Sequence, residues 1–351
     1  MNFKDLKQRF PQNDIITDAF GKPSVMVYIE KFYLDSVIDG ASHIPHPAFM
    51  LGEKELDGIY ISKFQNVLLD GCAYSLPDKD PTTKIDFDTA IDACASKGDG
   101  YHLMTAAEWG AIALWCQKNG WLPYGNNEMG KDIREENALA SIAYYDKERA
   151  ICRTATGTGP VEWSHNRQRD GIYDLNANVW EWVGGLRLVY GELQILAPSA
   201  VCAKLSQCAD STDWRAIDST SGELIIPNGK GSTQNSIKLD YVDSCWRYTG
   251  GEVTSLLNNI RFCSFANVKT DGSICKKAKE LLYSLGCIPV PSYNDPNVSL
   301  YANNGAEERI AFRGGRWGQG LNAGIFKTCL DDPRTFSSDA VGFRSAYYEV
   351  K

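Results

Sequence analysis

Basic residues are outnumbered by acidic ones in this chain. Lys and Arg number 36 against 44 Asp and Glu, which gives a formal net charge of -8 and an isoelectric point near 5.2. Proteins that bind nucleic acids through the phosphate backbone need clustered positive charge. The charge balance therefore argues against a general nucleic-acid binder, and we expect no nucleic-acid partner.

Long apolar runs are also missing. No segment approaches the roughly 18 apolar residues that a membrane-spanning helix needs, and residues 1–11 contain no apolar core of a secretion signal. We therefore expect a soluble chain that is made in the cytosol and has no membrane span.

Motifs for zinc or thiol redox chemistry are absent as well. The 11 cysteines are scattered and form no Cys-x-x-Cys pair. We expect most of them to be buried thiols, and only Cys202 and Cys208 lie at a spacing that suggests a loop disulfide. A structural role is expected over metal ligation for all the histidines, which are His43, His46, His102 and His165.

What the chain does contain is an ordinary globular composition, with 43% hydrophobic and 23% charged residues. An apolar stripe from Phe87 to Cys94 predicts a helix that ends at Gly98. The capping box from Thr105 to Glu108 predicts a second helix from Ala106 to about Gly120, and a third is expected near residues 273–285. Few helices, many short strands and abundant Gly and Asn indicate an α+β fold with long loops.

The C-terminal end combines two kinds of sequence. Ile310 to Trp317 and Val341 to Tyr348 alternate like strands, and each carries an arginine beside a glycine, Arg313 and Arg344. We expect these arginines to brace the frame through buried acceptors rather than to bind an anion. The segment between them follows neither the strand period nor the helix period, which is typical of a binding surface on a rigid frame. A surface loop without function is the alternative.

Five motifs in order resemble the formylglycine-generating enzyme (sulfatase-modifying factor) family. They are Gly100–Trp109, Pro123–Asn126, Gly171–Trp182, Arg313–Trp317 and Gly342–Arg344. The resemblance covers roughly residues 58–188 and 305–351. It implies the C-type lectin fold of that family, with short strands, two main helices, long loops and an insertion at about 189–304. Residues 1–57 would be an N-terminal accessory or attachment region, and 58–351 a lectin-like domain.

The C-terminal layout is similar to that of the variable proteins of diversity-generating retroelements: Arg-Gly-Gly-x-Trp, a hypervariable segment, then Gly-Phe-Arg. This resemblance implies a variable region at about 313–344 that an adenine-mutating reverse transcriptase rewrites. Gln319 and Lys327 would need Lys codons rather than Asn codons to arise in this way. The implied ligand-binding positions are Arg316, Trp317, Gly318, Gln319, Leu321, Asn322, Lys327, Cys329, Asp331, Asp332, Phe336 and Asp339.

The oxidase chemistry of the resembling family uses two thiols that bind copper. Aligned on Arg313, these two positions hold Gln319 and Gly324 here, and Cys329 matches a third position outside the pair. We therefore expect no enzymatic activity. A degenerate enzyme with a relocated active site remains an alternative. An iron-dependent branch uses a histidine triad, which the spacing of these histidines does not support.

Two further sites have alternative interpretations. Asn178 and Glu181 match positions that, by resemblance, can help to hold calcium through oxygen ligands, but a hydrogen-bonded structural carboxylate explains Glu181 equally well. No other cofactor is expected. Trp180, Trp182 and Trp317 could form a stacking platform for a ligand, although we expect at least two of them in the core.

The sequence thus predicts a ligand-binding or receptor-recognition protein with a hypervariable surface, most consistent with a phage tail or virion component. Phe336, Leu321 and Trp317 would be the apolar anchors, with Arg316, Lys327, Asp331 and Asp332 supplying charge. The ligand would be a protein or carbohydrate on a cell surface, and a virion attachment partner is possible. A bacterial cell-associated protein, a degenerate oxidase relative and an invariant structural virion protein are the alternatives.

Overall fold

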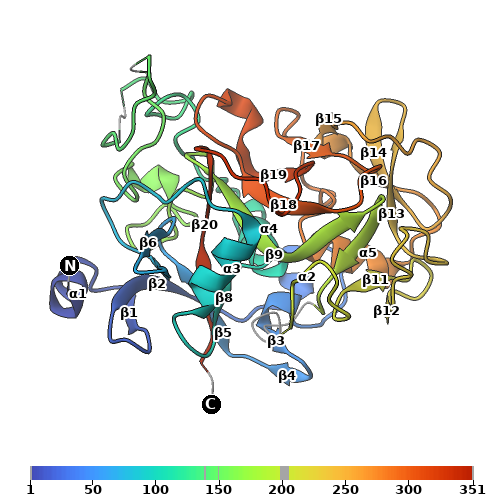
Figure 1. Cartoon of the computed structure of the whole chain (residues 1–351), viewed down its shortest axis with the longest axis horizontal. Helices are drawn as coiled ribbons and strands as arrows, with labels where there is room; N and C mark the ends of the chain where they lie inside the picture. The colour runs from blue at the N-terminus through green and yellow to red at the C-terminus, as the bar shows by residue number, and fades with distance from the viewer. Residues whose placement is uncertain (1, 138–139, 149, 198–204, 350–351) are drawn as a thin grey trace.

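A computed structural model describes the chain apart from residues 1, 138–139, 149, 198–204 and 350–351 (Figure 1). One five-stranded sheet joins segments from both halves of the chain, in the order β1-β2-β5-β21-β8. Its strands are β1 (Asp14–Thr17), β2 (Pro23–Glu30), β5 (Gly58–Ser62), β8 (Tyr101–Leu103) and β21 (Ser345–Tyr347). The strand that follows the expected variable region therefore lies inside a sheet whose other strands precede residue 104.

The N-terminal strands belong to this same sheet. β2 pairs with β5 from Met26 opposite Ser62 to Glu30 opposite Gly58, and β1 pairs with β2. Backbone pairing therefore crosses the boundary expected after residue 57, between Met26–Glu30 of β2 and β5, so residues on both sides of it share one sheet. An attachment role for the N-terminal residues stays a prediction.

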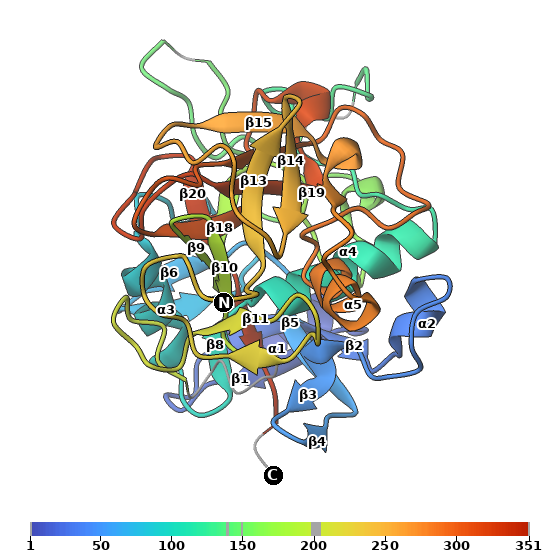
Figure 2. The ribbon, with the colours of Figure 1, turned by 90° about the vertical axis from the view of Figure 1, so that its right-hand side faces the viewer.

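A larger sheet of twelve strands in the described residues fills the other half of the molecule (Figure 2). Its main path runs β15-β17-β19-β18-β9-β10-β13-β14-β16, with β11, β12 and β20 attached at its sides. The segment expected as an insertion extends this sheet, and its β13–β14 hairpin stands at the front of Figure 2. The strands are β9 (Trp180–Val189), β10 (Glu192–Ile195), β11 (Arg215–Ile217), β12 (Leu224–Ile225), β13 (Lys238–Val242), β14 (Cys245–Thr249), β15 (Arg261–Ser264), β16 (Lys269–Thr270), β17 (Ser299–Ala302), β18 (Arg309–Gly314), β19 (Gly324–Leu330) and β20 (Val341–Phe343).

The helices confirm the sequence patterns. α3 spans Phe87–Ala95, α4 spans Ala106–Lys118 and α5 spans Lys276–Ser284. Thr105 and Glu108 form the expected capping box on α4, with Thr105 Oγ1 accepting from the Glu108 N–H at 3.2 Å. Among the described residues no helix has the length and apolar character to cross a membrane. The remaining short elements are α1 (Phe3–Arg9), α2 (Leu34–Val37), β3 (Met50–Leu51), β4 (Lys54–Glu55), β6 (Val67–Leu69) and β7 (Cys72–Tyr74).

Cysteines and histidines have mainly structural surroundings. Seven of the described cysteines are buried, at positions 72, 94, 116, 152, 263, 287 and 329, which confirms the expectation for most of them. Cys202 lies outside the described residues.

Two of the histidines are buried hydrogen-bond acceptors. His46 accepts from the Ala48 N–H, His165 accepts from the Ile172 N–H, and burial lowers the pKa of each ring to about 3. These two imidazoles are therefore neutral structural acceptors.

Arg344 links the two sheets through a fully buried ion pair. Its Nε and one terminal nitrogen donate to the two carboxylate oxygens of Glu181 on β9, at 2.9 and 2.8 Å. Its terminal nitrogens also donate to the Ser62 and Tyr173 carbonyls, at 2.8 and 2.9 Å. The side chain thus donates hydrogen bonds to acceptors on β5, on β9 and in the loop before β9, as expected for an arginine that braces the frame.

Arg313 does the same at the start of the variable region. Its terminal nitrogens donate to the Gly286 and Leu285 carbonyls at the end of α5, at 2.9 and 2.6 Å, and to Thr328 Oγ1 on β19 at 2.7 Å. Because the side chain is completely buried, its guanidinium stabilises contacts inside the protein and is out of reach of an anion in solvent.

Replacing Arg344 with Met should lower the free energy of unfolding by about 3–5 kcal/mol, because it leaves the Glu181 carboxylate buried without its partner. Urea unfolding followed by circular dichroism measures the loss. Lys22→Ala, which removes an exposed ion pair with Asp70, is the control and should leave the midpoint nearly unchanged. A similarly small loss for Arg344→Met would mean that water reaches Glu181 in the folded protein.

Candidate functional site

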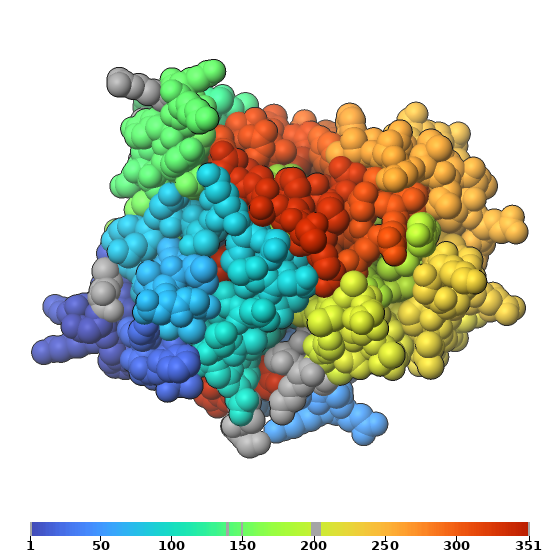
Figure 3. Space-filling model, in the orientation of Figure 1, coloured from blue at the N-terminus to red at the C-terminus, as the bar shows by residue number. Residues whose placement is uncertain are grey.

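The expected variable segment forms two loops around one strand. The first loop, residues 315–323, joins β18 to β19 and contains a 3-10 turn at Gly320–Asn322. The second, residues 331–340, joins β19 to β20. In Figures 1 and 2 this turn lies at the top and the C-terminus at the bottom. Figure 3 shows the C-terminal segment as a continuous red area of surface between the green and orange parts of the chain.

The first loop is tightly folded. Gly315 has φ +95°, and a Cβ there would come within 2.9 Å of the Ala323 Cβ. The Gln319 side-chain oxygen accepts from the Arg316 N–H at 2.9 Å. A side chain at position 315 would strain this turn. The glycine therefore allows the backbone conformation that places the exposed Arg316 directly after β18.

A pocket of about 260 Å³ opens between the two loops. Five of the sequence-predicted positions line it: Arg316, Gln319, Cys329, Asp332 and Phe336. The other lining residues are Trp180, Ile260, Tyr301, Phe312, Ser338, Ala340 and Val341. The fold therefore brings together predicted residues that are up to 20 positions apart, and adds residues from three other parts of the chain.

The pocket is mostly aromatic. The rings of Trp180 and Phe312 meet edge to face with centroids 4.9 Å apart, and Phe312 and Phe336 stack at 6.2 Å. The buried Lys327 ammonium contacts two of the rings, at 4.6 Å from the Tyr301 ring centre and 5.6 Å from that of Trp180. These contacts hold the rings in fixed orientations, so the pocket is preformed.

Two charged groups stand at its rim. The Arg316 side chain is exposed; it donates a weak hydrogen bond to the Trp317 carbonyl at 3.4 Å, and its guanidinium lies 5.7 Å from the Trp317 ring centre. Burial raises the pKa of the Asp332 carboxyl to about 6, with the neighbouring Asp331 adding to the effect and Arg309 opposing it. Near neutral pH the rim therefore presents one cation and one carboxylate.

The twelve predicted positions differ in exposure. Arg316, Gly318, Leu321 and Asp339 are exposed, and Gln319, Asn322, Asp331, Asp332 and Phe336 are half-buried. Trp317, Lys327 and Cys329 are buried. Trp180, Trp182 and Trp317 are 8%, 0% and 7% exposed, which confirms the expectation that most of these rings belong to the core.

The expectation that Lys327 supplies charge to the binding surface is wrong. Its side chain is fully buried beneath the first loop, where the ammonium donates to Ser299 Oγ at 3.4 Å and to the Asn322 side-chain oxygen. Burial lowers its pKa to about 7. Lys327 and Cys329 are two positions apart and share one face of β19. Because the strand is buried on both faces, the alternation of side chains gave no information about the exposure of Lys327.

Of the two positions of the missing thiol pair, Gln319 lies on the first loop and Gly324 is the first residue of β19. Gln319 is engaged with the Arg316 backbone, and a Cβ at Gly324 would lie 2.9 Å from Val298 Cγ2. Cys329 is the thiol that lines the pocket, and burial holds its pKa well above the ordinary value. A protonated, buried thiol is a poor nucleophile and a poor metal ligand.

The calcium candidates are occupied by protein contacts. Both carboxylate oxygens of Glu181 accept from Arg344, and Asn178 Oδ1 accepts from Asn126 Nδ2 and the Thr154 N–H. Within the described part of the chain, no cluster of three or more His, Cys, Asp or Glu side chains is arranged to hold a metal ion. A calcium ion would have to displace Arg344, so the structural interpretation of Glu181 fits better.

Sequence reasoning missed the contribution of the 189–304 segment. Tyr301 reaches the pocket because β17 pairs in parallel with β19, with Tyr301 opposite Cys329, and Ile260 precedes the edge strand β15 that pairs with β17. Nothing in the local pattern around Ile260 signals this position, because a pairing between distant strands determines it.

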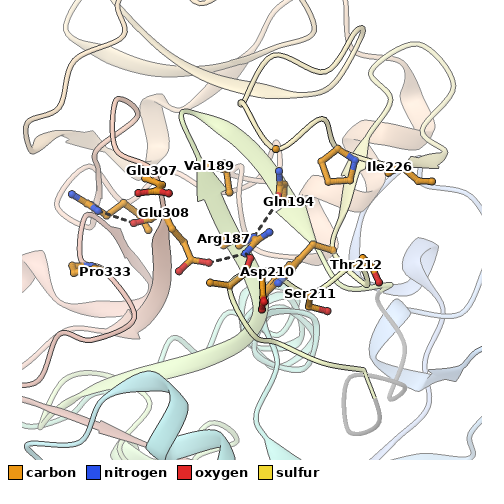
Figure 4. A pocket seen from close by; sticks show the side chains of 15 residues that line it. Arg187, Val189, Gln194, Asp210, Ser211, Thr212, Ile226, Glu307, Glu308 and Pro333 are labelled. Atoms are coloured by element: carbon orange, nitrogen blue, oxygen red, sulfur yellow. Dashed lines mark hydrogen bonds and ion pairs between the residues drawn. The ribbon is translucent and has the colours of Figure 1, made fainter.

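A larger pocket of about 610 Å³ lies near the second loop, between β9, β10 and residues 209–212. Figure 4 shows Arg187 at its centre, between Gln194 and Glu308. Glu308 also pairs with Arg334 of the second loop at 2.7 Å. The central charges of this pocket are therefore paired with one another.

Known proteins that resemble this chain include one family and distant solved structures. Residues 12–200, more than half of the chain, match the model of the sulfatase-modifying factor enzyme 1-like domain. PvdO from Pseudomonas aeruginosa is 11% identical, with a TM-score of 0.36 over 95% of this chain and 98% of that one. Treponema denticola variable protein 1 is 12% identical, with a TM-score of 0.32 over 96% and 99%. Comparison with curated proteins found no match.

Replacing Lys327 with Met should stabilise the protein most at pH 6, because it removes a buried charge. In the wild type the folded pKa of Lys327, about 7, is lower than the unfolded value of 10.5. The unfolded state therefore binds more protons between these pH values, and wild-type stability rises with pH. The advantage of the variant should shrink by about 1.4 kcal/mol per pH unit above pH 7. Urea unfolding at pH 6, 7.5 and 9 measures it, and a pH-independent difference would contradict the burial of a neutral amine.

Proposed function

Because the chain belongs to the sulfatase-modifying factor enzyme 1-like family, we propose that it uses the fold of that family as a fixed frame for a variable ligand-binding surface. The membership confirms the expected C-type lectin fold of the formylglycine-generating enzyme type. The proposed surface consists of the two loops 315–323 and 331–340 and of the pocket between them.

The observation that carries this proposal is the convergence of predicted variable positions on one pocket. Arg316, Gln319, Cys329, Asp332 and Phe336 lie up to 20 positions apart in the sequence and line the same 260 Å³ pocket. The two frame arginines, Arg313 and Arg344, are fully buried below it. Loop side chains can therefore change without removing the hydrogen bonds that hold the frame.

The same geometry favours binding over catalysis. The thiol pair of the resembling oxidases is replaced by Gln319 and Gly324, and the space at Gly324 is limited by Val298. Cys329 is a protonated buried thiol. We therefore propose a non-enzymatic member of the family, whose binding function requires no cofactor.

The biological setting follows from the resemblance of the C-terminal motifs. We propose a target protein of a diversity-generating retroelement, used as a phage tail or virion recognition protein that meets a ligand on a cell surface. A bacterial cell-associated recognition protein is the second setting. The gene neighbourhood tests both, because each requires a reverse-transcriptase gene and a near-copy of the last coding segment that differs at adenines. Absence of both features would contradict diversification.

Random codons at Arg316, Leu321, Phe336 and Asp339 should yield folded binders, because these side chains lie at the pocket or on the exposed loops. The library is displayed on yeast and selected against an immobilised folded protein such as lysozyme. We expect enrichment of specific binders whose melting temperatures remain within a few degrees of the parent, since exposed substitutions usually change stability by under about 0.5 kcal/mol.

A matched library at Glu53, Lys54, Glu55 and Asp57 is the control. These residues are exposed on and beside the β3–β4 hairpin, in a part of the surface that the pocket does not reach. This library should fold equally well and yield few or no binders. Failure of the loop library to fold, or equal enrichment from both libraries, would count against a dedicated binding surface.

A further inference from the structure

Part of the pocket wall lies outside the predicted variable region. Trp180 on β9, Phe312 on β18 and Tyr301 on β17 come from strands of the large sheet. Ile260, which is 53% exposed, stands at the edge and comes from the 189–304 segment. Of these four, none belongs to the predicted variable set. The aromatic floor would thus stay the same while the rim residues Arg316, Gln319, Asp332 and Phe336 change.

The volume limits what can enter. Pockets that enclose whole small-molecule ligands usually measure about 300–1,000 Å³, whereas this one measures about 260 Å³. A pocket of this size suits a single large side chain. In protein interfaces such pockets at the centre of the contact receive aromatic anchors, surrounded by contacts that mainly exclude water.

The charges argue against a cationic occupant. Lys327 already places its ammonium 5.6 Å from the Trp180 ring centre and 4.6 Å from that of Tyr301, and Arg316 lines the opening. A ligand cation would compete with the Lys327 ammonium for the Trp180 and Tyr301 rings, and the Arg316 guanidinium would repel it. A neutral aromatic ring instead gains an edge-to-face contact with Trp180 or Phe312 and can receive the Arg316 guanidinium over its face.

The polar groups argue against a sugar. A carbohydrate needs several free hydrogen-bonding groups around a ring platform. Here Gln319 Oε1 accepts from the Arg316 backbone and Ser338 Oγ accepts from the Ala340 N–H. Among the described residues no side chain or backbone N–H donates a hydrogen bond to the Asp332 carboxylate, so this carboxylate can accept from one donor at the tip of an aromatic ring.

We propose that this pocket receives one tryptophan or tyrosine side chain of a protein partner, with the ring against Trp180 and Phe312 of the floor and its N–H or O–H donated to Asp332 at the rim. The inference rests on the proposed binding function and narrows the partner from a protein or carbohydrate to a protein that exposes such a side chain. Partner affinity would come mainly from the fixed floor, and partner choice from the variable rim.

The test measures the binding of N-acetyl-tryptophanamide to the whole chain by saturation-transfer and protein-observed NMR. It should bind saturably and up to about tenfold more tightly than N-acetyl-leucinamide, because contacts between aromatic rings add up to about one power of ten in affinity. The 1-methyl derivative of the indole should bind about tenfold more weakly than the parent, because it cannot donate to a carboxylate. Methyl mannoside should not bind.

Two neighbouring variants locate the site. Ser338 lines the pocket and the exposed Ser337 does not. Ser338→Trp fills the pocket and should abolish tryptophanamide binding, whereas Ser337→Trp adds the same ring beside it and should leave binding unchanged. Equal affinity for the leucine and tryptophan probes, preference for the mannoside, or insensitivity to Ser338→Trp would each overturn the inference. Loss of the difference between indole and 1-methylindole would overturn the role of Asp332.

These outcomes are separable from failure of the proposed function. If the loop library yields binders but tryptophanamide does not bind, the proposal of a variable binding surface stands and only the proposal of an aromatic-binding pocket is contradicted. If the loop library yields no binders, the proposed ligand-binding function itself is contradicted.

Discussion

The buried pair between Arg344 and Glu181 is the interaction on which the site depends. Glu181 lies on β9, in the middle of the large sheet, and Arg344 lies between β20, which pairs with β9, and β21, which pairs with β5 and β8. The pair therefore holds the two sheets together at the point where the variable segment ends. Arg313 fixes the other end against α5. Between these two anchors the chain can vary in sequence while its ends keep their positions.

Desolvation makes this arrangement costly to disturb. A guanidinium and a carboxylate without access to water are stable only when all their hydrogen-bonding atoms have partners. Arg344 meets this condition with four contacts to Glu181, Ser62 and Tyr173. At the rim, the exposed Arg316 guanidinium has only weak contacts, a 3.4 Å hydrogen bond to the Trp317 carbonyl and a position 5.7 Å from the Trp317 ring centre. The charges that brace the frame are therefore buried, and the arginine at the pocket rim is exposed.

Local sequence patterns predicted the local features well. The capping box at Thr105, the helix that begins at Ala106 and the bracing arginines all depend on residues close in sequence or on simple burial rules. The variable positions followed from a motif resemblance, and five of them line one pocket. Tyr301 and Ile260 could not be predicted, because their place depends on the pairing of β15, β17 and β19. Lys327 was misplaced because its strand is buried on both faces, so alternation carried no information about exposure.

The order of the five-stranded sheet also bears on how the protein is made. β21 follows the variable segment in the chain yet lies between β5 and β8, two strands that leave the ribosome much earlier. The facing edges of β5 and β8 stay unpaired until the segment before β21 has been synthesised and has folded back, so that β21 can pair with both strands. Contacts of such long sequence separation form slowly. A segment between β18 and β20 that cannot close would therefore leave the edges of β5 and β8 unpaired and exposed to aggregation or proteolysis.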